Sequence, residues 1–362
     1  MAVGLYIHVP FCKRKCPYCD FYSQELSDGL ESDYIHAVIR NLIRYKGETL
    51  DSIYFGGGTP SLLSDKSFEE IFFAIKDNFT LINPEISLEA NPCSVTFEKL
   101  KFLREVGFNR ISFGVQSCVD SELEALGRIH TFSQAENSVR NAQKAGFSNI
   151  SCDLMLGIIG QTKESLDFSI SKLTDLSITH VSAYILKIEQ GTRYNRKEII
   201  ESLPDEDFVS KGYLQAVEAL SKKGFEQYEI SNFSKAGYEC RHNLKYWLCE
   251  EYIGIGPSAH SFFNGKRYAV PPDIKNFNEN AHQREIVNEE SPRTFEEVAM
   301  LRLRLTDGLE FSVCEEFGVD KEVIIKKAEP LKKAGFVNIY EDRIAITREG
   351  FLVSNEIIAR LI

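Results

Sequence analysis

The amino-acid sequence predicts an α/β fold: a part-open parallel (β/α)6 barrel followed by a small winged-helix-like α+β domain. Three observations lead to this prediction. Short β-rich runs alternate with longer amphipathic runs over residues 1–200, six strands are counted there, and the elements of residues 291–362 follow a different order. Alternating strands and helices imply a parallel sheet with right-handed crossovers, and a closed barrel needs eight such units. A doubly wound open sheet is the alternative.

The elements of residues 1–200 are assigned to the barrel. The first helix is expected over Tyr34–Ile43, where apolar residues fall on one helical face. The second is expected to open at Ser67, with Glu70 completing a capping box. Gly107 and Gly146 should end the helices before the fourth and fifth strands. The six expected strands are Leu5–Val9, Ser52–Phe55, Glu85–Ala90, Arg110–Gln116, Asn149–Leu156 and His180–Leu186.

Residues 201–290 form a second segment in this reading. A helix is expected over Phe208–Lys222 and a strand over Glu226–Ile230. The polar stretch Asn264–Pro292 has no clear periodicity and is interpreted as a linker.

Residues 291–362 form the expected winged-helix-like domain. Thr294 and Glu297 make a capping box before a helix. A hairpin is expected over Phe336–Ile346, and a helix ends the chain. The acidic residues of this segment favour packing or partner docking over DNA binding.

Charge and hydropathy exclude several classes of function. The chain has 362 residues, of which 42 are Lys or Arg and 53 are Asp or Glu, so its formal charge is -11. This charge argues against nucleic acid as a partner. No run approaches the roughly 18 apolar residues of a membrane-spanning helix, and the N-terminal residues lack the features of a secretion signal. We expect a cytoplasmic protein that does not insert into a membrane.

Three of the nine cysteines, Cys12, Cys16 and Cys19, lie in one loop after the first expected strand. An odd number of cysteines without a regular framework argues against disulfides. Parallel α/β folds place their chemistry at this end of the strands. Three thiolates can hold a [4Fe–4S] cluster and leave one iron open. A structural zinc site is the alternative, and it would need a fourth ligand such as His8 or Asp20.

The spacing Cys12-x3-Cys16-x2-Cys19, with Tyr18 before the last Cys, resembles the signature of the radical S-adenosylmethionine (SAM) superfamily. The resemblance implies a partial barrel, a [4Fe–4S] cluster on these cysteines, and SAM at the open iron as the source of a 5′-deoxyadenosyl radical. A Gly-rich turn, Gly56–Pro60, follows the second expected strand. Residues without a Cβ let the backbone approach a ligand closely.

Further segments resemble the oxygen-independent coproporphyrinogen III oxidase family over nearly the whole chain. They are Tyr6–Cys12, Gly56–Leu62, Glu89–Pro92, Asn109–Ser117, Gly127–His130, Asp153–Gly157 and Tyr228–Asn232. The guanidinium of Arg128 suits a carboxylate. Carried over residue by residue, the resemblance implies a SAM site lined by Tyr6, Gly56, Gly57, Thr59, Glu89, Gln116, Arg128 and Asp153.

Two departures separate the chain from the oxidases of this family. Phe21 stands where the oxidases carry a further Cys, and the oxidases have a substantial extension before the first cluster ligand. The chain also has Ile159 where the family usually has Pro. The segment His242–Trp247 resembles instead the HNxxYW motif of the HemW-type heme chaperones, which deliver heme to hemoproteins.

Heme is the third cofactor that this resemblance implies. His242 and Tyr246 share a face if their segment is helical, and imidazole is a common axial heme ligand, phenolate an occasional one. We expect heme near these two residues. The alternative is that His242, Tyr246 and Trp247 form a hydrogen-bonded core cluster.

The sequence therefore indicates a heme chaperone that carries a [4Fe–4S] cluster, SAM and heme. Its expected partners are acceptor hemoproteins, with membrane-associated respiratory proteins among them, and an electron donor. The first alternative is an oxygen-independent coproporphyrinogen III oxidase, which would decarboxylate a tetrapyrrole by a radical route. The second is a cluster-bearing binding protein whose SAM site is vestigial.

Overall fold

A computed structural model describes residues 2–27 and 29–362, and a 12-stranded sheet forms its main body, in the order β14-β13-β12-β11-β1-β4-β5-β6-β7-β8-β10-β9. Its centre confirms the part-open barrel, because six strands run parallel in chain order. These strands are β1 (Val3–Val9), β4 (Thr49–Gly57), β5 (Thr80–Ala90), β6 (Arg110–Gln116), β7 (Asn149–Leu156) and β8 (His180–Ile185).

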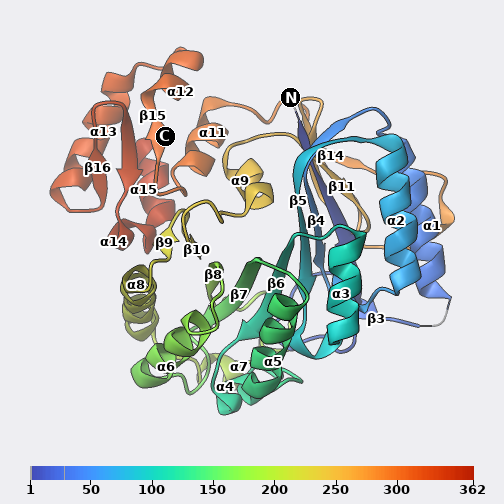
Figure 1. Cartoon of the computed structure of the whole chain (residues 1–362). Helices are drawn as coiled ribbons and strands as arrows, with labels where there is room; N and C mark the ends of the chain where they lie inside the picture. Colours follow the sequence, from blue (N-terminus) through green and yellow to red (C-terminus); the bar gives the residue numbers. More distant parts are fainter. Residues whose placement is uncertain (1, 28) are drawn as a thin grey trace.

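Helices connect these strands and cover their outer side (Figure 1). They are α1 (Leu30–Ile43), α2 (Asp65–Asn78), α3 (Phe97–Val106), α4 (Asp120–Ala125), α5 (Phe132–Lys144) and α6 (Lys163–Thr174), followed by α7 (Lys197–Ile200) and α8 (Glu206–Lys222). Gly107, with φ of 136°, ends α3 as predicted. The predicted start of α2 at Ser67 is wrong by one turn, because the Ser64 side chain accepts the hydrogen bond from the Ser67 N–H.

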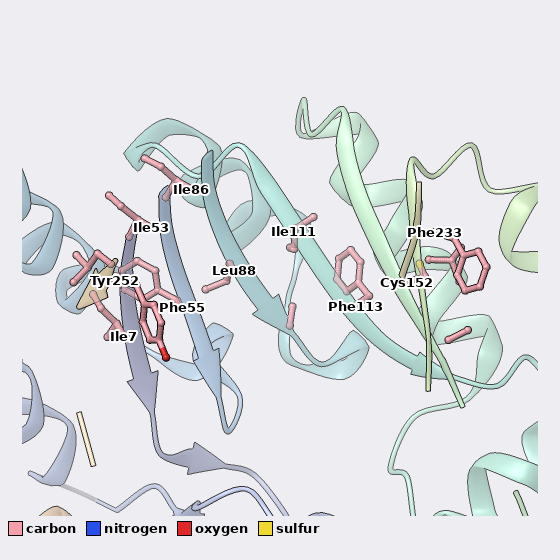
Figure 2. Packing of buried hydrophobic residues seen from close by; sticks show 14 of the residues in the cluster. Ile7, Ile53, Phe55, Ile86, Leu88, Ile111, Phe113, Cys152, Phe233 and Tyr252 are labelled. Carbon is pink, nitrogen blue, oxygen red and sulfur yellow. The ribbon is translucent and has the colours of Figure 1, made fainter. Parts of the chain in front are cut away.

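Residues along each barrel strand alternate between the helices and the barrel interior, as the two-residue period of a strand requires. On β6, Ile111 and Phe113 are fully buried under the helices, whereas Ser112 and Gly114 contact polar groups of the interior. Figure 2 shows the apolar set from neighbouring strands packed together, including Ile53, Phe55, Ile86, Leu88, Ile111 and Phe113. The outer residues thus form the hydrophobic core, and the inner residues leave a polar lumen for a site.

Residues 201–290 extend the sheet at both ends, which corrects the predicted linker. Asn264–Pro292 contributes β13 (Lys266–Ala269), α10 (Ile274–Glu279) and β14 (Ile286–Glu289), because the antiparallel ladder started by β11 (Tyr252–Ile255) and β12 (His260–Phe263) continues through it. At the other end, the strand predicted over Glu226–Ile230 is shorter, and the sheet ends with β9 (Glu226–Gln227) and β10 (Asn232–Ser234). The division of the chain at residues 200 and 290 stays a prediction.

The short helix α9 (Arg241–Trp247) lies on the side of the strands opposite α1 and α2 (Figure 1). The Glu85 carboxylate of β5 accepts hydrogen bonds from the backbone N–H groups of Arg241 and His242, at 3.2 and 3.3 Å. A carboxylate at a helix N-terminus satisfies its free N–H groups. Since Glu85 precedes Glu89 on the same strand, α9 lies toward the N-terminal ends of the barrel strands.

The C-terminal segment is a separate small α+β unit with its own three-stranded sheet, in the order β15-β17-β16. The Thr294 side chain caps its first helix by accepting from the Glu297 N–H, as predicted. No helix in the described residues is long and apolar enough to cross a membrane. The elements are α11 (Phe295–Arg302), β15 (Leu309–Glu310), α12 (Phe311–Glu316), α13 (Lys321–Lys333), β16 (Val337–Ile339), β17 (Arg343–Ile346), α14 (Arg348–Phe351) and α15 (Ser354–Leu361).

Candidate functional site

The three predicted cluster ligands lie in a loop at the C-terminal end of β1. Cys12 ends β2 (Phe11–Cys12), which pairs with β3 (Gln24–Glu25) and so ties the two ends of the loop together. All three thiols are free and half-buried. The Thr59 hydroxyl donates to the Cys12 Sγ at 3.6 Å, and the Arg128 guanidinium donates to the Cys16 Sγ at 3.4 Å. Donors of this kind stabilise thiolates, the form that binds metal.

The surroundings of the loop decide between a cluster and zinc. His8, one suggested fourth zinc ligand, is buried, and its Nδ1 and Nε2 atoms lie 3.0 Å from the Tyr6 hydroxyl and 2.9 Å from the Tyr22 carbonyl oxygen. Asp20, the other, is exposed. A structural zinc site needs a fourth protein ligand, whereas three cysteines can hold a cubane cluster, so the loop fits a cluster better than zinc.

One part of the predicted SAM site forms around Glu89, at the end of β5. The Tyr54 hydroxyl donates to Glu89 Oε1 at 2.8 Å, and the Gly57 N–H donates to Oε2 at 3.1 Å. A Cβ on Gly56 would lie 3.0 to 3.2 Å from Tyr54, Tyr6 and Glu89, so this position leaves room for backbone only. Burial raises the pKa of the Glu89 carboxyl to about 7.

The other part forms around Gly114 of β6, which sequence reasoning did not select. A Cβ there would lie 3.2 Å from both Arg128 and Gln116 and 4.0 Å from Asp153. Arg128 donates to the Gly114 carbonyl oxygen at 2.6 Å, and Ser112 donates to Asp153 at 3.2 Å. Burial raises the pKa of Asp153 to about 6.

Gln116 and Arg128 leave polar atoms in this part of the site without a protein partner. The backbone of Gln116 has φ of 72°, a left-handed conformation that costs a side-chain-bearing residue energy. Its Oε1 atom is buried without a hydrogen-bond partner, as is Nε of Arg128. Buried polar groups are normally paired, so these atoms fit a polar ligand such as the amino-acid or ribose groups of SAM.

The structure therefore brings the predicted SAM residues together around two centres under the cysteine loop. Tyr54, Gly114 and Ser112 were missed. The two-residue period of a strand places Tyr54 two residues before Gly56, and Gly114 and Ser112 two and four residues before Gln116, so this signal was present in the sequence. Thr59 reaches the loop itself, since its N–H donates to the Phe11 carbonyl oxygen at 2.7 Å.

The predicted heme residues lie deeper in the lumen than the SAM residues. His242 is fully buried, with Nδ1 2.9 Å from the Ser52 hydroxyl and Nε2 2.9 Å from the Tyr246 hydroxyl. Burial lowers the pKa of His242 to about 3, so the ring is neutral. The ring stacks on Tyr54, with centroids 5.3 Å apart. In this conformation both ring nitrogens are occupied, as the core-cluster alternative describes.

Arg110, the first residue of β6, is a buried cation that sequence reasoning also missed. It is 2 % exposed, and its Nε and Nη1 atoms have no hydrogen-bond partner. Nearby Glu85 is engaged by the N-terminus of α9. An incompletely paired guanidinium inside a barrel is costly, so Arg110 has donors left for an anionic group of a ligand.

Comparison with known proteins decides the family. The Radical SAM superfamily model matches residues 6–173, and the HemN C-terminal domain model matches residues 294–353. Heme chaperone HemW of Bacillus subtilis is 34% identical over 97% of this chain and 97% of its own length. The chain belongs to the HemW family. HemW of Haemophilus influenzae is 35% identical over 98% of this chain and 97% of its own.

A solved structure adds to the assignment of the fold. Coproporphyrinogen III oxidase (HemN) from Escherichia coli superposes with a TM-score of 0.82 over 99% of this chain and 90% of its own, at 20% identity. At this identity the likeness shows a shared fold. As a radical SAM protein of the HemW family, the chain carries a [4Fe–4S] cluster and SAM, and the three thiols and the unpartnered polar atoms of the lumen fit these groups.

Proposed function

We propose that this protein is a heme chaperone, which binds heme and delivers it to acceptor hemoproteins. The observation that carries the proposal is the identity of 34% and 35% to two proteins named heme chaperone HemW, over 97% and 98% of this chain. The acceptors would include membrane-associated respiratory proteins, met transiently from the cytoplasm without insertion into the bilayer. Nucleic acid is not among the proposed partners of this acidic chain.

The cluster is assigned to Cys12, Cys16 and Cys19. When bound, it would supply an electron to SAM at its open iron. The carboxylates of Glu89 and Asp153 suit the cationic and hydroxyl-bearing parts of SAM, and the Arg128 guanidinium suits its carboxylate. The whole assigned SAM set is Tyr6, Gly56, Gly57, Thr59, Glu89, Gln116, Arg128 and Asp153.

The heme site is assigned to His242 and Tyr246. The hydrogen bond between His242 Nε2 and the Tyr246 hydroxyl, 2.9 Å long, would have to open for either side chain to hold the heme. The helix that carries both residues is seven residues long, and a short helix has few backbone bonds to break. Arg110, below the predicted SAM site, is a cation that suits a heme propionate.

The electron donor is proposed to be an acidic protein that meets the cysteine loop. Lys13, Arg14 and Lys15 lie between the first two cluster ligands, and none of them enters an ion pair within the part of the chain that the structure describes. Phe21, at the other end of the loop, is 61% exposed. Cations around an apolar side chain favour an acidic partner and speed its association.

A titration with hemin separates the chaperone from the oxidase. The protein is purified without oxygen, its cluster is reconstituted, and heme binding is followed by the Soret band. We expect stable binding and no conversion of coproporphyrinogen III. Formation of protoporphyrinogen would establish the oxidase, and absence of heme binding would remove the chaperone proposal.

A matched pair of histidines tests the ligand assignment. His180 is as buried as His242, and its Nδ1 and Nε2 atoms lie 2.8 Å from the hydroxyls of Ser151 and Tyr228. Both changes, His242→Ala and His180→Ala, remove a buried imidazole between a serine and a tyrosine. We expect only His242→Ala to weaken heme binding and shift the Soret band, and equal spectra for both variants would exclude His242 as a ligand.

A further inference from the structure

The outer face of the barrel carries an apolar groove between α1 and α2 that the proposed cofactor sites do not use. Its volume is about 490 Å³. Ile39 and Ile43 of α1 line one wall, and Phe73 of α2 lines the other. Phe73 is 75% exposed and Ile43 is 51% exposed. Large apolar side chains grouped in an exposed hollow usually mark a binding surface.

The rim of this groove is acidic. Glu69 and Asp77 lie four residues before and after Phe73, so the three side chains follow one another along the same face of α2. Among the described residues neither Glu69 nor Asp77 enters an ion pair, and the third acid of the rim, Glu70, pairs with Lys66 at 3.6 Å. The groove therefore presents an apolar floor with two negative charges that no side chain neutralises.

The cations of α1 and of the residue that follows it, Arg40 and Arg44, do not pair with these acids, because they are bound to residues 278–285. Arg40 donates to the carbonyl oxygens of Asn278 and Asn280, at 2.7 and 3.1 Å. Arg44 pairs with Glu285 at 2.9 Å. The negative charge of the groove is thus available to a partner.

We propose that the α1–α2 groove binds an amphipathic helix of a partner protein, with apolar side chains on the groove floor and Lys or Arg at its rim. Helices commonly dock in grooves through apolar residues spaced by three or four positions. Charge complementarity supports a cationic partner and argues against two other occupants: an anionic lipid surface would be repelled by the rim, and a second copy of the chain carries a net charge of -11.

The position of the groove leaves the cofactor sites accessible. Ile43 and Asn78 end α1 and α2, which lead into the N-terminal ends of β4 and β5. The cysteine loop lies at the opposite, C-terminal end of β1. A partner held at the groove would therefore leave the loop free for electron transfer.

The probe for this proposal is a synthetic amphipathic helix of Leu and Lys, labelled with fluorescein, added to the full-length protein and followed by fluorescence anisotropy. We expect saturable binding that weakens with ionic strength. Phe73→Ser should weaken it at least tenfold, and so should the double change Glu69→Lys with Asp77→Lys. Each altered side chain is exposed, so the variants should fold, and circular dichroism would check this.

A control variant makes the result specific. Phe168 on α6 is 45% exposed and lies outside the groove, so Phe168→Ser should leave the affinity unchanged. Absence of binding, equal losses in the two Phe variants, or equal binding of a Leu and Glu peptide would each overturn the proposal. If the protein forms concentration-dependent dimers that Phe73→Ser abolishes, the groove binds a second copy of the chain instead. If it adheres to phosphatidylserine vesicles and Phe73→Ser abolishes this adhesion, the groove binds a membrane instead.

Discussion

Replacing Glu89 by Gln tests the electrostatics of the barrel lumen. The pKa of its carboxyl is raised from 4.5 to about 7: burial raises it most, the Tyr54 hydrogen bond opposes this, and the charge of Asp153 adds to it. The folded state therefore favours the protonated carboxyl. Its contribution to stability is complete below the ordinary pKa and is lost as the pH rises through about 7. The difference in pKa corresponds to roughly 3 kcal/mol.

The measurement is the free energy of unfolding in urea, for the cluster-free wild type and for Glu89→Gln, at a series of pH values. The variant keeps an acceptor for Tyr54 and carries no charge. As the pH rises from about 4.5 to about 8, the wild type should lose stability and the variant should not. We therefore expect the free energy of unfolding of the variant to rise by up to about 3 kcal/mol relative to that of the wild type. A pH-independent difference between Glu89→Gln and the wild type would refute the reasoning.

Three further predictions concern the cluster and the core. Cys12→Ala should lower the bound iron and sulfide per chain after reconstitution, whereas Cys314→Ala, in the C-terminal unit, should leave both unchanged. Phe108→Ala removes a ring that packs against three other phenylalanines and should cost about 3–5 kcal/mol in urea unfolding; a cost under about 1 kcal/mol would contradict this packing. Gly254→Ala would place a Cβ 2.0 Å from a backbone carbonyl oxygen and should lower the melting temperature strongly. In the control variant Gly160→Ala the added Cβ meets no atom within 4 Å, and its left-handed backbone should cost roughly 1–2 kcal/mol. Equal melting temperatures of the Gly254→Ala and Gly160→Ala variants would contradict the steric argument.

The strands of the barrel were predictable because each is a short β-rich run in which apolar residues recur, set between longer amphipathic runs. β6 and β7 have the predicted bounds, Arg110–Gln116 and Asn149–Leu156. The start of α2 was missed by one turn because two serines compete for the cap, and their local sequence does not rank them. Asn264–Pro292 was wrongly interpreted as a linker because its strands β13 and β14 lie at the edge of the sheet. Edge strands bury little surface, so they can form from polar residues without an apolar pattern.

The cysteine loop was also predictable, because its three thiols are close in sequence and spacing alone identifies them. The lumen contacts were not. Tyr54 meets Glu89, 35 positions away, and Arg128 meets Gly114, 14 positions away. The first pair depends on the register of β4 against β5, and the second depends on how the segment after α4 packs against β6.

What the sequence by itself determined is the order of elements, the family and the ligands that lie near one another along the chain. Local propensity, apolar period and loop spacing carry this information. The tertiary structure alone decided which polar groups share the lumen, that His242 is enclosed by Ser52 and Tyr246, and that α1 and α2 leave an acidic groove. The physical reason is that burial and hydrogen-bond partners arise from packing between distant segments, and only the folded chain brings those segments together.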